Sequence, residues 1–375
     1  MPVDLNHELP AAPLRIAMVI PPWYDIPPTG YGGIESMCAA LVDALSARGH
    51  EVTVFGAGRA TGVGARFVST VETLQYPRLG EAAPAALHAA RVDTLLHHDR
   101  YDVVHDHSPC GPLTARHRRI PTVVTAHGPA DGELGDFYET LGPSIHLVAI
   151  SQSQRLRRPG LPWFATIHNA IDPAQFSYSA SPDGPVLWLA RFCPEKGPDL
   201  AIQACRAAGL PLVLAGKCTE PAERRYLAEV IRPMLGSDTE LILNTDRATA
   251  RRLLSGARCL VLPLRWHEPF GMVMVEAMAS GTPVVALRRG SVPEIVRNGV
   301  TGIVCDDVED LPAALAHAGE LDPAHGMAHV REHFEADLMA RRYEAVYRRA
   351  STRGRLNHTR DIDVERWRAI DDARR

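Results

Sequence analysis

Short runs of apolar residues recur along the chain and alternate with longer stretches in which apolar residues are spaced three or four positions apart. The short runs are typical of buried strands, and the longer stretches of amphipathic helices. The runs that predict strands are residues 15–20, 52–55, 103–105, 122–126, 146–150, 186–190, 212–215, 240–243, 259–262, 284–287 and 302–304. Strands that alternate with helices predict an α/β protein with parallel sheets and right-handed crossovers.

The helical pattern is clearest over residues 34–48, and Gly49 marks the end of that helix. The ranges that predict further helices are 200–208, 248–255 and 323–349. Between the two series of strands, residues 171–185 are rich in proline, serine, aspartate and glycine, which favours a connection between domains.

We therefore predict an N-terminal Rossmann-like domain over residues 1–172 and a C-terminal one over residues 173–350. The last helices of the second range are candidates to pack back on the first domain, and residues 351–375 form a charged tail. Open parallel sheets bind ligands at the carboxyl ends of their strands, so the pattern predicts a site in a cleft between the two domains.

Length and composition restrict the class of function. The 375 residues suit two domains, and 46% apolar with 22% charged residues is ordinary for a globular protein. The net charge of -4 comes with no dense basic cluster, so no nucleic-acid partner is expected. No run of 18 apolar residues predicts a transmembrane helix, and seven cysteines without a C-x-x-C pair predict reduced thiols in a cytoplasmic protein.

Residues 268–279 read EPFGMVMVEAMA. Glu268 is predicted to cap a helix, with Pro269 in its first turn and Gly271 leaving the backbone open to a ligand. Glu276 would then lie about 12 Å further along the axis, with an anion-attracting helix N-terminus between the carboxylates. A nucleotide-sugar, with hydroxyl groups at both ends and phosphate between them, fits this arrangement. Alternatively, Glu268 only caps the helix and Glu276 is solvated, although its apolar neighbours argue against solvation.

The loop after the first predicted strand, PPWYDIPPTGYGGI, opens a helix at Gly32 and Gly33, where the backbone can approach a phosphate. The dinucleotide fingerprint G-x-G-x-x-G fails, because Glu35 stands at its third glycine. A nicotinamide-dependent dehydrogenase is therefore disfavoured. A glycine pair that only forms a turn remains the alternative.

Two cations and one histidine stand at predicted strand ends. Arg191 and Lys196 lie between a strand and a helix, where they suit a diphosphate better than the alternative of a solvated surface. His127 ends a strand just before Gly128, which favours a position at the cleft over a purely structural histidine.

Two segments suggest metal binding, but neither supports it. His105-Asp106-His107 has no third ligand placed by its spacing. Asp361-Ile362-Asp363 resembles the D-x-D of metal-dependent sugar transferases, yet it lies in the charged tail with no strand before it. No metal is predicted.

These motifs together resemble those of retaining family 4 glycosyltransferases with the GT-B fold, from about residue 15 to residue 349. The motifs that carry the resemblance are Gly32-Gly33-Ile34-Glu35, Thr125-Ala126-His127-Gly128, Asn169-Ala170-Ile171-Asp172, Arg191 with Lys196-Gly197, Ala215-Gly216-Lys217, and the pair Glu268 and Glu276. Their order and spacing are specific to the family.

The resemblance implies two Rossmann-like domains facing each other across a cleft, a nucleotide-sugar as co-substrate, and no cofactor. The residues that it places at the donor site are Gly32, Gly33, Gly216, Phe270, Gly271 and Glu276 for binding, and Arg191, Lys196, Glu268 and His127 for catalysis. The two cations would neutralise the diphosphate, Glu276 would hold the ribose hydroxyls, and Glu268 and His127 would lie beside the transferred sugar. Such enzymes need no metal and retain the anomeric configuration.

Three departures from the family pattern stand out. Asn169-Ala170 replaces Asn-Gly at the domain change, Asn244-Thr245-Asp246 replaces a glycine, and Arg289-Gly290 replaces two glycines. They leave open the turn at residue 170, base recognition near Asn244, and whether Arg289 contacts a donor carboxylate, a phosphate or solvent. Glu294 follows in the expected place.

The expected function is a metal-independent, retaining transfer of a sugar from a nucleotide-diphosphate sugar, a UDP-sugar as first choice. The acceptor-side candidates are Trp23, Tyr24, Asp25 and Tyr31. A small molecule, a glycan and a lipid-linked acceptor, the last with peripheral membrane contact, remain open. Two other functions also remain open: a nucleotide-sugar epimerase of the same fold, and a nucleotide-sugar-binding protein without catalysis. A binding protein, however, has no need of a complete leaving-group site.

Overall fold

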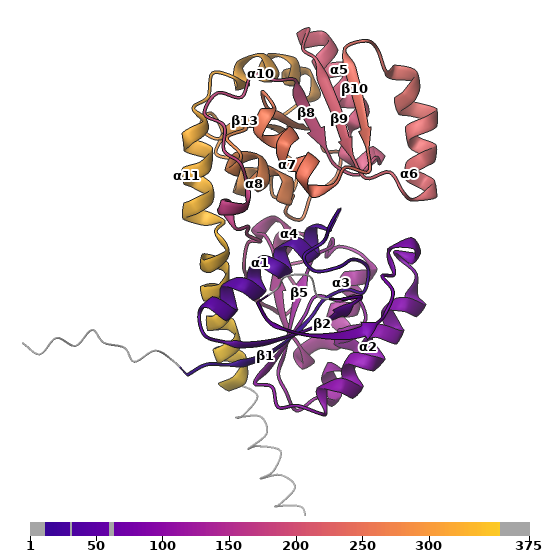
Figure 1. The fold of residues 1–375 in the computed structure, drawn as a ribbon, viewed down its shortest axis with the longest axis vertical. Coiled ribbons are helices and arrows are strands. Elements are labelled where there is room, and N and C mark those ends of the chain that lie inside the picture. The colour runs from indigo at the N-terminus through magenta and orange to yellow at the C-terminus, as the bar shows by residue number, and fades with distance from the viewer. Residues whose placement is uncertain (1–11, 31, 60–63, 353–375) are drawn as a thin grey trace, which may run out of the picture.

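Two parallel sheets form the framework of the molecule, one in each half of the chain (Figure 1). The computed structural model describes residues 12–30, 32–59 and 64–352. Within these ranges, the first sheet has seven strands in the order β3-β2-β1-β4-β5-β6-β7, and the second has six in the order β10-β9-β8-β11-β12-β13. In both sheets the strand order reverses beside the first strand, which is where doubly wound sheets bind ligands.

The elements of the first domain are β1 (Arg15–Val19), α1 (Gly33–Ala47), β2 (Glu51–Ala57), β3 (Arg66–Val71), α2 (Ala82–Leu96), β4 (Val103–Asp106), β5 (Thr122–Ala126), α3 (Glu133–Leu141), β6 (His146–Ala149), α4 (Gln152–Arg157) and β7 (Trp163–Thr166). Those of the second are β8 (Val186–Leu189), α5 (Pro198–Ala208), β9 (Leu212–Gly216), α6 (Pro221–Tyr226), β10 (Thr239–Leu243), α7 (Arg247–Gly256), β11 (Leu260–Leu262), α8 (Met272–Ala279), β12 (Val284–Leu287), α9 (Val292–Ile295), β13 (Gly302–Cys305), α10 (Leu311–Ala318) and α11 (Pro323–His333).

Each strand predicted from the sequence is present, with ends shifted by one or two residues. The apolar runs arise because the strands are buried on both faces. In β1, Ile16 and Met18 pack toward α1, whereas Ala17 and Val19 pack toward α2 on the other face. The sequence did not predict β3 and β7. Both are edge strands. In β3 the exposed Arg66 and Ser69 interrupt the apolar pattern, and β7 is a short strand of four residues, three of them partly exposed.

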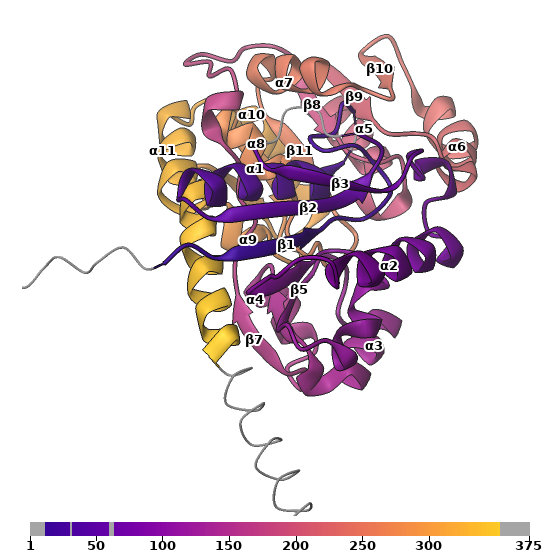
Figure 2. The same ribbon diagram turned by 60° about the horizontal axis from the view of Figure 1, so that its bottom comes forward.

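The end of the described chain returns to the first domain. Residues 336–352 are helical and follow α11, and Figures 1 and 2 show this yellow segment running from the second domain along the first. The crossing is held at Ile171, whose N–H donates to Phe334 O over 3.0 Å and whose O accepts from Ala336 N over 2.8 Å. Tyr343 and Tyr347 are then fully buried in the core of the first domain.

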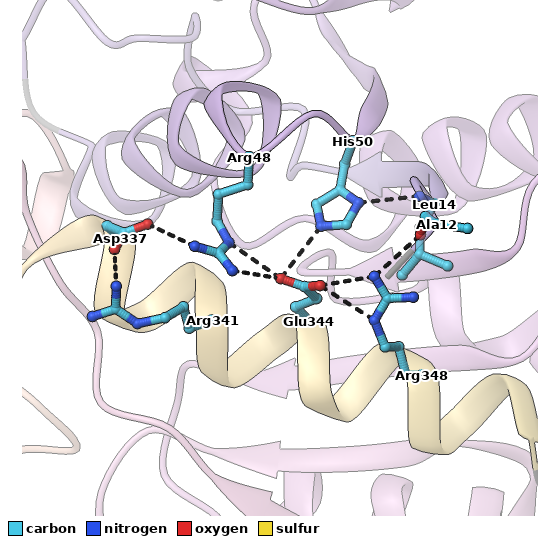
Figure 3. Close-up of polar contacts among 8 residues, drawn as sticks. All are labelled: Ala12, Leu14, Arg48, His50, Asp337, Arg341, Glu344 and Arg348. Atoms are coloured by element: carbon cyan, nitrogen blue, oxygen red, sulfur yellow. Dashed lines mark hydrogen bonds and ion pairs between the residues drawn. The ribbon is translucent and has the colours of Figure 1, made fainter. Parts of the chain in front are cut away.

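A polar cluster fixes the outer side of this helix (Figure 3). Glu344 accepts two hydrogen bonds from Arg48, over 3.1 and 2.9 Å, and two from Arg348, over 3.2 and 2.8 Å. His50 Nε2 lies 3.6 Å from the same carboxylate. Burial raises the pKa of Glu344, but the hydrogen bonds from Arg348 and Arg48 outweigh it and lower the pKa to about 2.

None of the helices in the described ranges is long and apolar enough to cross a membrane.

Candidate active site

Two segments of the second domain meet at the carboxyl ends of β8 and β11. Lys196 follows β8, whereas Trp266 and Glu268 follow β11. Lys196 Nζ forms an ion pair with Glu268 Oε2, and Trp266 Nε1 donates a hydrogen bond to the same oxygen over 3.0 Å. Lys196 Nζ also lies 4.8 Å from the centre of the Trp266 ring. Glu268 is only 8% exposed, so these partners compensate the charge of its carboxylate.

The prediction that Glu268 caps a helix and that Pro269 lies in its first turn was wrong. Helix α8 begins at Met272, and its N-cap is Gly271, which has a left-handed φ of 80°. The chain before the helix is held by the loop after β12, where Ser291 N donates to Glu268 O over 2.9 Å. The Glu268 carboxylate therefore binds Lys196 instead of helix N–H groups, and the predicted spacing of two carboxylates along one helix axis does not apply.

A cavity of about 310 Å³ opens beside this ion pair. Its lining residues are Arg191, Cys193, Pro194, Glu195, Lys196, Glu220, Ala222, Glu223 and Trp266. Arg191 Nη1 lies 3.9 Å from Glu223 Oε1, and Lys217 Nζ lies 3.1 Å from the same oxygen. Sequence analysis missed Glu223 and Trp266. The E-P-A-E segment that starts at Glu220 forms a capping box, a signal that could have marked Glu223, whereas no sequence pattern marks Trp266.

The turn after β9 brings two backbone segments close together. Gly216 has a φ of 141°, and a Cβ atom there would lie 1.8 Å from Ala190 O. Asn244 N donates to Gly216 O over 2.7 Å, and Asn244 Oδ1 accepts from Cys218 N over 2.9 Å. With a φ of 54°, Asn244 takes a left-handed conformation where the family pattern has a glycine. Asparagine tolerates this conformation better than most residues, so the departure preserves the turn.

Glu276 lies on α8 close to two arginines of α7, Arg247 and Arg251. Burial raises the pKa of Glu276, and the charges of the arginines oppose that rise. Arg247 also links the two domains, because its N–H donates a long hydrogen bond, 3.5 Å, to Thr29 O in the first domain. Glu276 therefore has cationic neighbours near a domain contact, unlike a residue on a solvated helix face.

The side chain of Phe270 belongs to the core. It is 2% exposed, and its ring centre lies 6.0 Å from that of Phe334 and 5.9 Å from that of His168. The ring is thus occupied by protein neighbours, and the carbonyl oxygen of Phe270 accepts a hydrogen bond from Ser291 Oγ over 2.7 Å, so only the backbone N–H of this residue is left for contact with a donor sugar.

In the first domain, Gly32 is the N-cap of α1 and Gly33 its first residue. A Cβ atom on Gly32 would lie 2.9 Å from Pro28 Cβ, whereas one on Gly33 would meet nothing within 4 Å. The helix N-terminus therefore faces open space at Gly33. Glu35 is buried in the first turn of the helix, and burial raises its pKa to about 8.

The acceptor-side candidates lie in the loop between β1 and α1. Trp23 is 7% exposed and therefore packs within the domain. The ring of Tyr24 stacks on Tyr76, with ring centres 6.0 Å apart and planes 10° from parallel. Asp25 Oδ1 accepts a hydrogen bond from a backbone N–H of its own loop over 3.2 Å. Tyr31 lies outside the described residues. Sequence analysis missed the contact with Tyr76, which joins two loops far apart in the chain.

His127 follows β5 and lies beside another histidine. Its Nε2 is 2.8 Å from Nδ1 of His107, and His105 Nδ1 is 2.7 Å from the hydroxyl of Tyr347. The ring nitrogens of the H-D-H segment thus contact protein neighbours. In the described part of the chain, no group of three histidine, cysteine or acidic residues could hold a metal ion. Residues 361–363, the D-x-D segment, lie outside that part.

Glu294 connects the domains at a second place. Its carboxylate accepts hydrogen bonds from Gln152 N over 2.7 Å and Ser153 N over 2.6 Å, and lies 3.1 Å from His168 Nε2. Although burial raises the pKa of Glu294, these bonds outweigh it and lower the pKa.

The sequence left the partner of Arg289 open. In the structure its guanidinium group donates a hydrogen bond to the carbonyl oxygen of Arg288 over 3.1 Å.

Two family models match the chain in succession. The model for Glycosyltransferase Family 4 matches residues 31–175, and the model for Glycosyl transferases group 1 matches residues 177–322. The chain is a family 4 glycosyltransferase. This glycosyltransferase has the predicted GT-B fold, with one parallel-sheet domain under each model.

Known relatives agree with the assignment. The glycosyltransferase is 27% identical to a phosphatidyl-myo-inositol mannosyltransferase of Mycolicibacterium smegmatis, over 80% of this chain and 84% of the relative. A solved glycosyltransferase involved in avilamycin A biosynthesis is 26% identical, with a TM-score of 0.71 over 91% of this chain and 98% of that one. Anabaena HepE in complex with UDP-glucose shares the fold, with a TM-score of 0.68 at 18% identity over 89% of this chain and 99% of that one.

Proposed function

We propose that this glycosyltransferase transfers a sugar from a nucleotide-diphosphate sugar, a UDP-sugar as first choice, with retention of configuration and without a metal ion. The observation that carries the proposal is the cavity at the carboxyl ends of β8 and β11, which Arg191 and Lys196 line and beside which Lys196 forms an ion pair with Glu268. Two cationic side chains suit a diphosphate leaving group, because each can donate charge-assisted hydrogen bonds to phosphate oxygens. The fold shared with a UDP-glucose complex supports UDP as the first nucleotide to test.

The positions of Arg191 and Lys196 explain how the leaving group would be stabilised. As the bond between the anomeric carbon and the phosphate oxygen breaks, negative charge gathers on the diphosphate. Preorganised cations at that place lower the barrier more than they strengthen binding of the intact donor. The acceptor oxygen bonds to the anomeric carbon on the same face, and its proton passes to the departing phosphate oxygen.

Binding of the donor would also break the ion pair between Lys196 and Glu268. An incoming diphosphate competes for the Lys196 ammonium group, because two phosphate charges attract it more strongly than one carboxylate. Glu268 is then free to accept hydrogen bonds from hydroxyls of the transferred sugar, while Trp266 Nε1 holds one of its oxygens. Donor binding thus converts an internal ion pair into two contacts with the donor.

Transfer is favoured over the two other functions considered. Both family models describe glycosyl transferases, and an epimerase or a simple binding protein would need no acceptor side. We propose a cytoplasmic enzyme, since its seven cysteines are free thiols, as expected in a reducing compartment. The acceptor would approach from the first domain, near Tyr24 and Asp25.

A thermal-shift screen with UDP, GDP, ADP, TDP and their sugars identifies the donor, because a ligand that binds the folded state raises the melting temperature. Purified enzyme and the selected donor are then incubated with candidate acceptors, and NMR of the product reports the anomeric configuration. An inverted product would contradict the proposed mechanism.

Kinetics of four variants then test the roles in the site. Arg191→Ala and Lys196→Ala should each lower kcat by about 10²-fold or more, while binding of the free nucleotide weakens less. Glu276→Ala should mainly raise KM, because ribose contacts are equal in the ground and transition states. Glu268→Ala should lower kcat and relax the choice of sugar.

The control is Arg206→Ala, which removes an exposed arginine of α5 outside the cavity and should leave kcat unchanged. Near-normal kcat in Lys196→Ala together with loss of kcat in Glu276→Ala would mean that the phosphates lie at the other end of α8.

A further inference from the structure

Two histidines from neighbouring strands form a hydrogen-bonded pair in the first domain. His107 follows β4 and His127 follows β5, and these strands run parallel and side by side. His107 Nδ1 lies 2.8 Å from His127 Nε2. His107 is 4% exposed, whereas His127 is partly exposed. The pair therefore joins a buried ring to one that solvent can reach.

A third side chain determines the direction of this hydrogen bond. Nε2 of His107 lies 3.2 Å from the sulfur of Met18 on β1, and a thioether can only accept. His107 Nε2 therefore carries a hydrogen. Burial lowers the pKa of His107 well below 6.5, so the ring is neutral and carries that hydrogen alone. Its Nδ1 is then a lone pair, which must accept from His127.

The direction of this hydrogen bond also determines which nitrogen of His127 carries a hydrogen. His127 donates through Nε2–H, and burial lowers its pKa to about 4, so at neutral pH its Nδ1 has no hydrogen. Among the described residues nothing forms a hydrogen bond with His127 Nδ1, and this atom is not among the fully buried unpartnered ones. It is an acceptor open to a ligand.

We propose that His107 is a positioning residue, which holds His127 in its Nε2–H form so that Nδ1 accepts a hydrogen bond from a hydroxyl of the transferred sugar. This inference rests on the proposed function, and it takes the place of His127 beside that sugar from the resemblance to family 4 glycosyltransferases. The opposite tautomer would turn an N–H toward the hydroxyl and change the hydrogen bond that selects it.

Further contacts hold the inner ring in place. His105 lies against His107, with ring centres 4.0 Å apart. His105 itself is held at both nitrogens, by the Tyr347 hydroxyl over 2.7 Å and by Thr125 Oγ1 over 2.8 Å. Tyr347 belongs to residues 336–352, so the returning helix supports the histidine pair through His105.

The test measures the tautomer of His127 by ¹⁵N NMR of the full chain labelled at histidine, with His127→Gln to assign its signals. In the unmodified protein at pH 7, His127 should be in the Nε2–H form. His107→Leu should yield a mixture of both tautomers, and His107→Asn should keep the Nε2–H form, because its side-chain oxygen can replace the Nδ1 acceptor. Met18→Leu preserves volume and removes only the sulfur acceptor, so it tests the same direction with little effect on folding.

Activity separates this inference from the proposed function. His107→Leu should lower kcat/KM about tenfold, the effect of one lost hydrogen bond, with rescue by His107→Asn and an unchanged thermal shift by UDP. An Nδ1–H form in the unmodified protein, or an unchanged tautomer in both His107→Leu and Met18→Leu, would overturn the inference. So would a shifted tautomer with unchanged kcat/KM. Absence of any transfer would instead refute the proposed function, while the tautomers would remain measurable.

Discussion

Replacement of Glu344 by glutamine should destabilise the first domain in a pH-dependent way. Glutamine has nearly the same shape but carries no charge, so it loses the charge-assisted hydrogen bonds from Arg48 and Arg348 (Figure 3). The helix formed by residues 336–352 supplies part of the core of the first domain, so weaker anchoring of this helix reduces the stability of that domain.

The magnitude follows from the pKa of the carboxylate. The native pKa of Glu344 is about 2, against an ordinary value of 4.5. At about 1.4 kcal/mol for each pKa unit, this difference corresponds to about 3 kcal/mol, and screening by water on the surface side reduces it to about 2 kcal/mol. Because the native pKa is depressed, this stability is fully present above pH 4.5. It is lost as the pH falls toward 2.

Urea unfolding followed by circular dichroism at pH 7 and at pH 2.5 measures both effects. At pH 7 the variant should unfold with a free energy lower by about 2 kcal/mol, and at pH 2.5 most of that difference should disappear. The matched control is Asp337→Asn on the same helix, whose carboxylate also contacts Arg48 but is 45% exposed. It should cost about 0.5 kcal/mol or less. A difference for Glu344→Gln that persists unchanged at pH 2.5 would refute the electrostatic explanation.

Three further results are expected. Transfer should survive an excess of EDTA, because Arg191 and Lys196 supply the charge that a metal would; loss of transfer with rescue by Mn²⁺ or Mg²⁺ would contradict this. Saturating donor should reduce the radius of gyration in small-angle scattering as the cleft closes about residues 172–185, and an unchanged radius would count against closure. Gly216→Ala should lower stability by about 3 kcal/mol or more, since its Cβ would clash with Ala190 O, whereas Gly160→Ala, with nothing within 4 Å, should cost little.

Much of the fold can be read directly from the sequence. Central strands of parallel sheets are buried on both faces, so each leaves a continuous apolar run among consecutive residues, and every such run became a strand. The edge strand β3 escapes this rule because the exposed Arg66 and Ser69 interrupt its apolar pattern, and the short edge strand β7 was also missed. The family motifs at strand ends likewise indicated glycosyl transfer before any contact was known.

The identity of partners within the site required the tertiary structure. Glu268 stands at a position typical of a helix cap, yet its carboxylate pairs with Lys196, 72 residues away in the chain. That choice depends on β8 and β11 being neighbours in the sheet, which no local pattern encodes. The contact of the Trp266 ring with Lys196 Nζ, at 4.8 Å, depends on the same strand order.

The histidine pair likewise combines a feature that the sequence indicates with contacts that only the tertiary structure shows. The sequence marked His127 as the end of a strand and left His107 as part of a rejected metal motif. Only the side-by-side order of β1, β4 and β5 brings the Met18 sulfur and the two rings together, and with them the direction of the hydrogen bonds. Periodicity is a property of consecutive residues, so the sequence alone determines which segments become strands and helices. Hydrogen bonds and ion pairs between distant segments depend on strand order and packing, so only the tertiary structure decides which side chains act together.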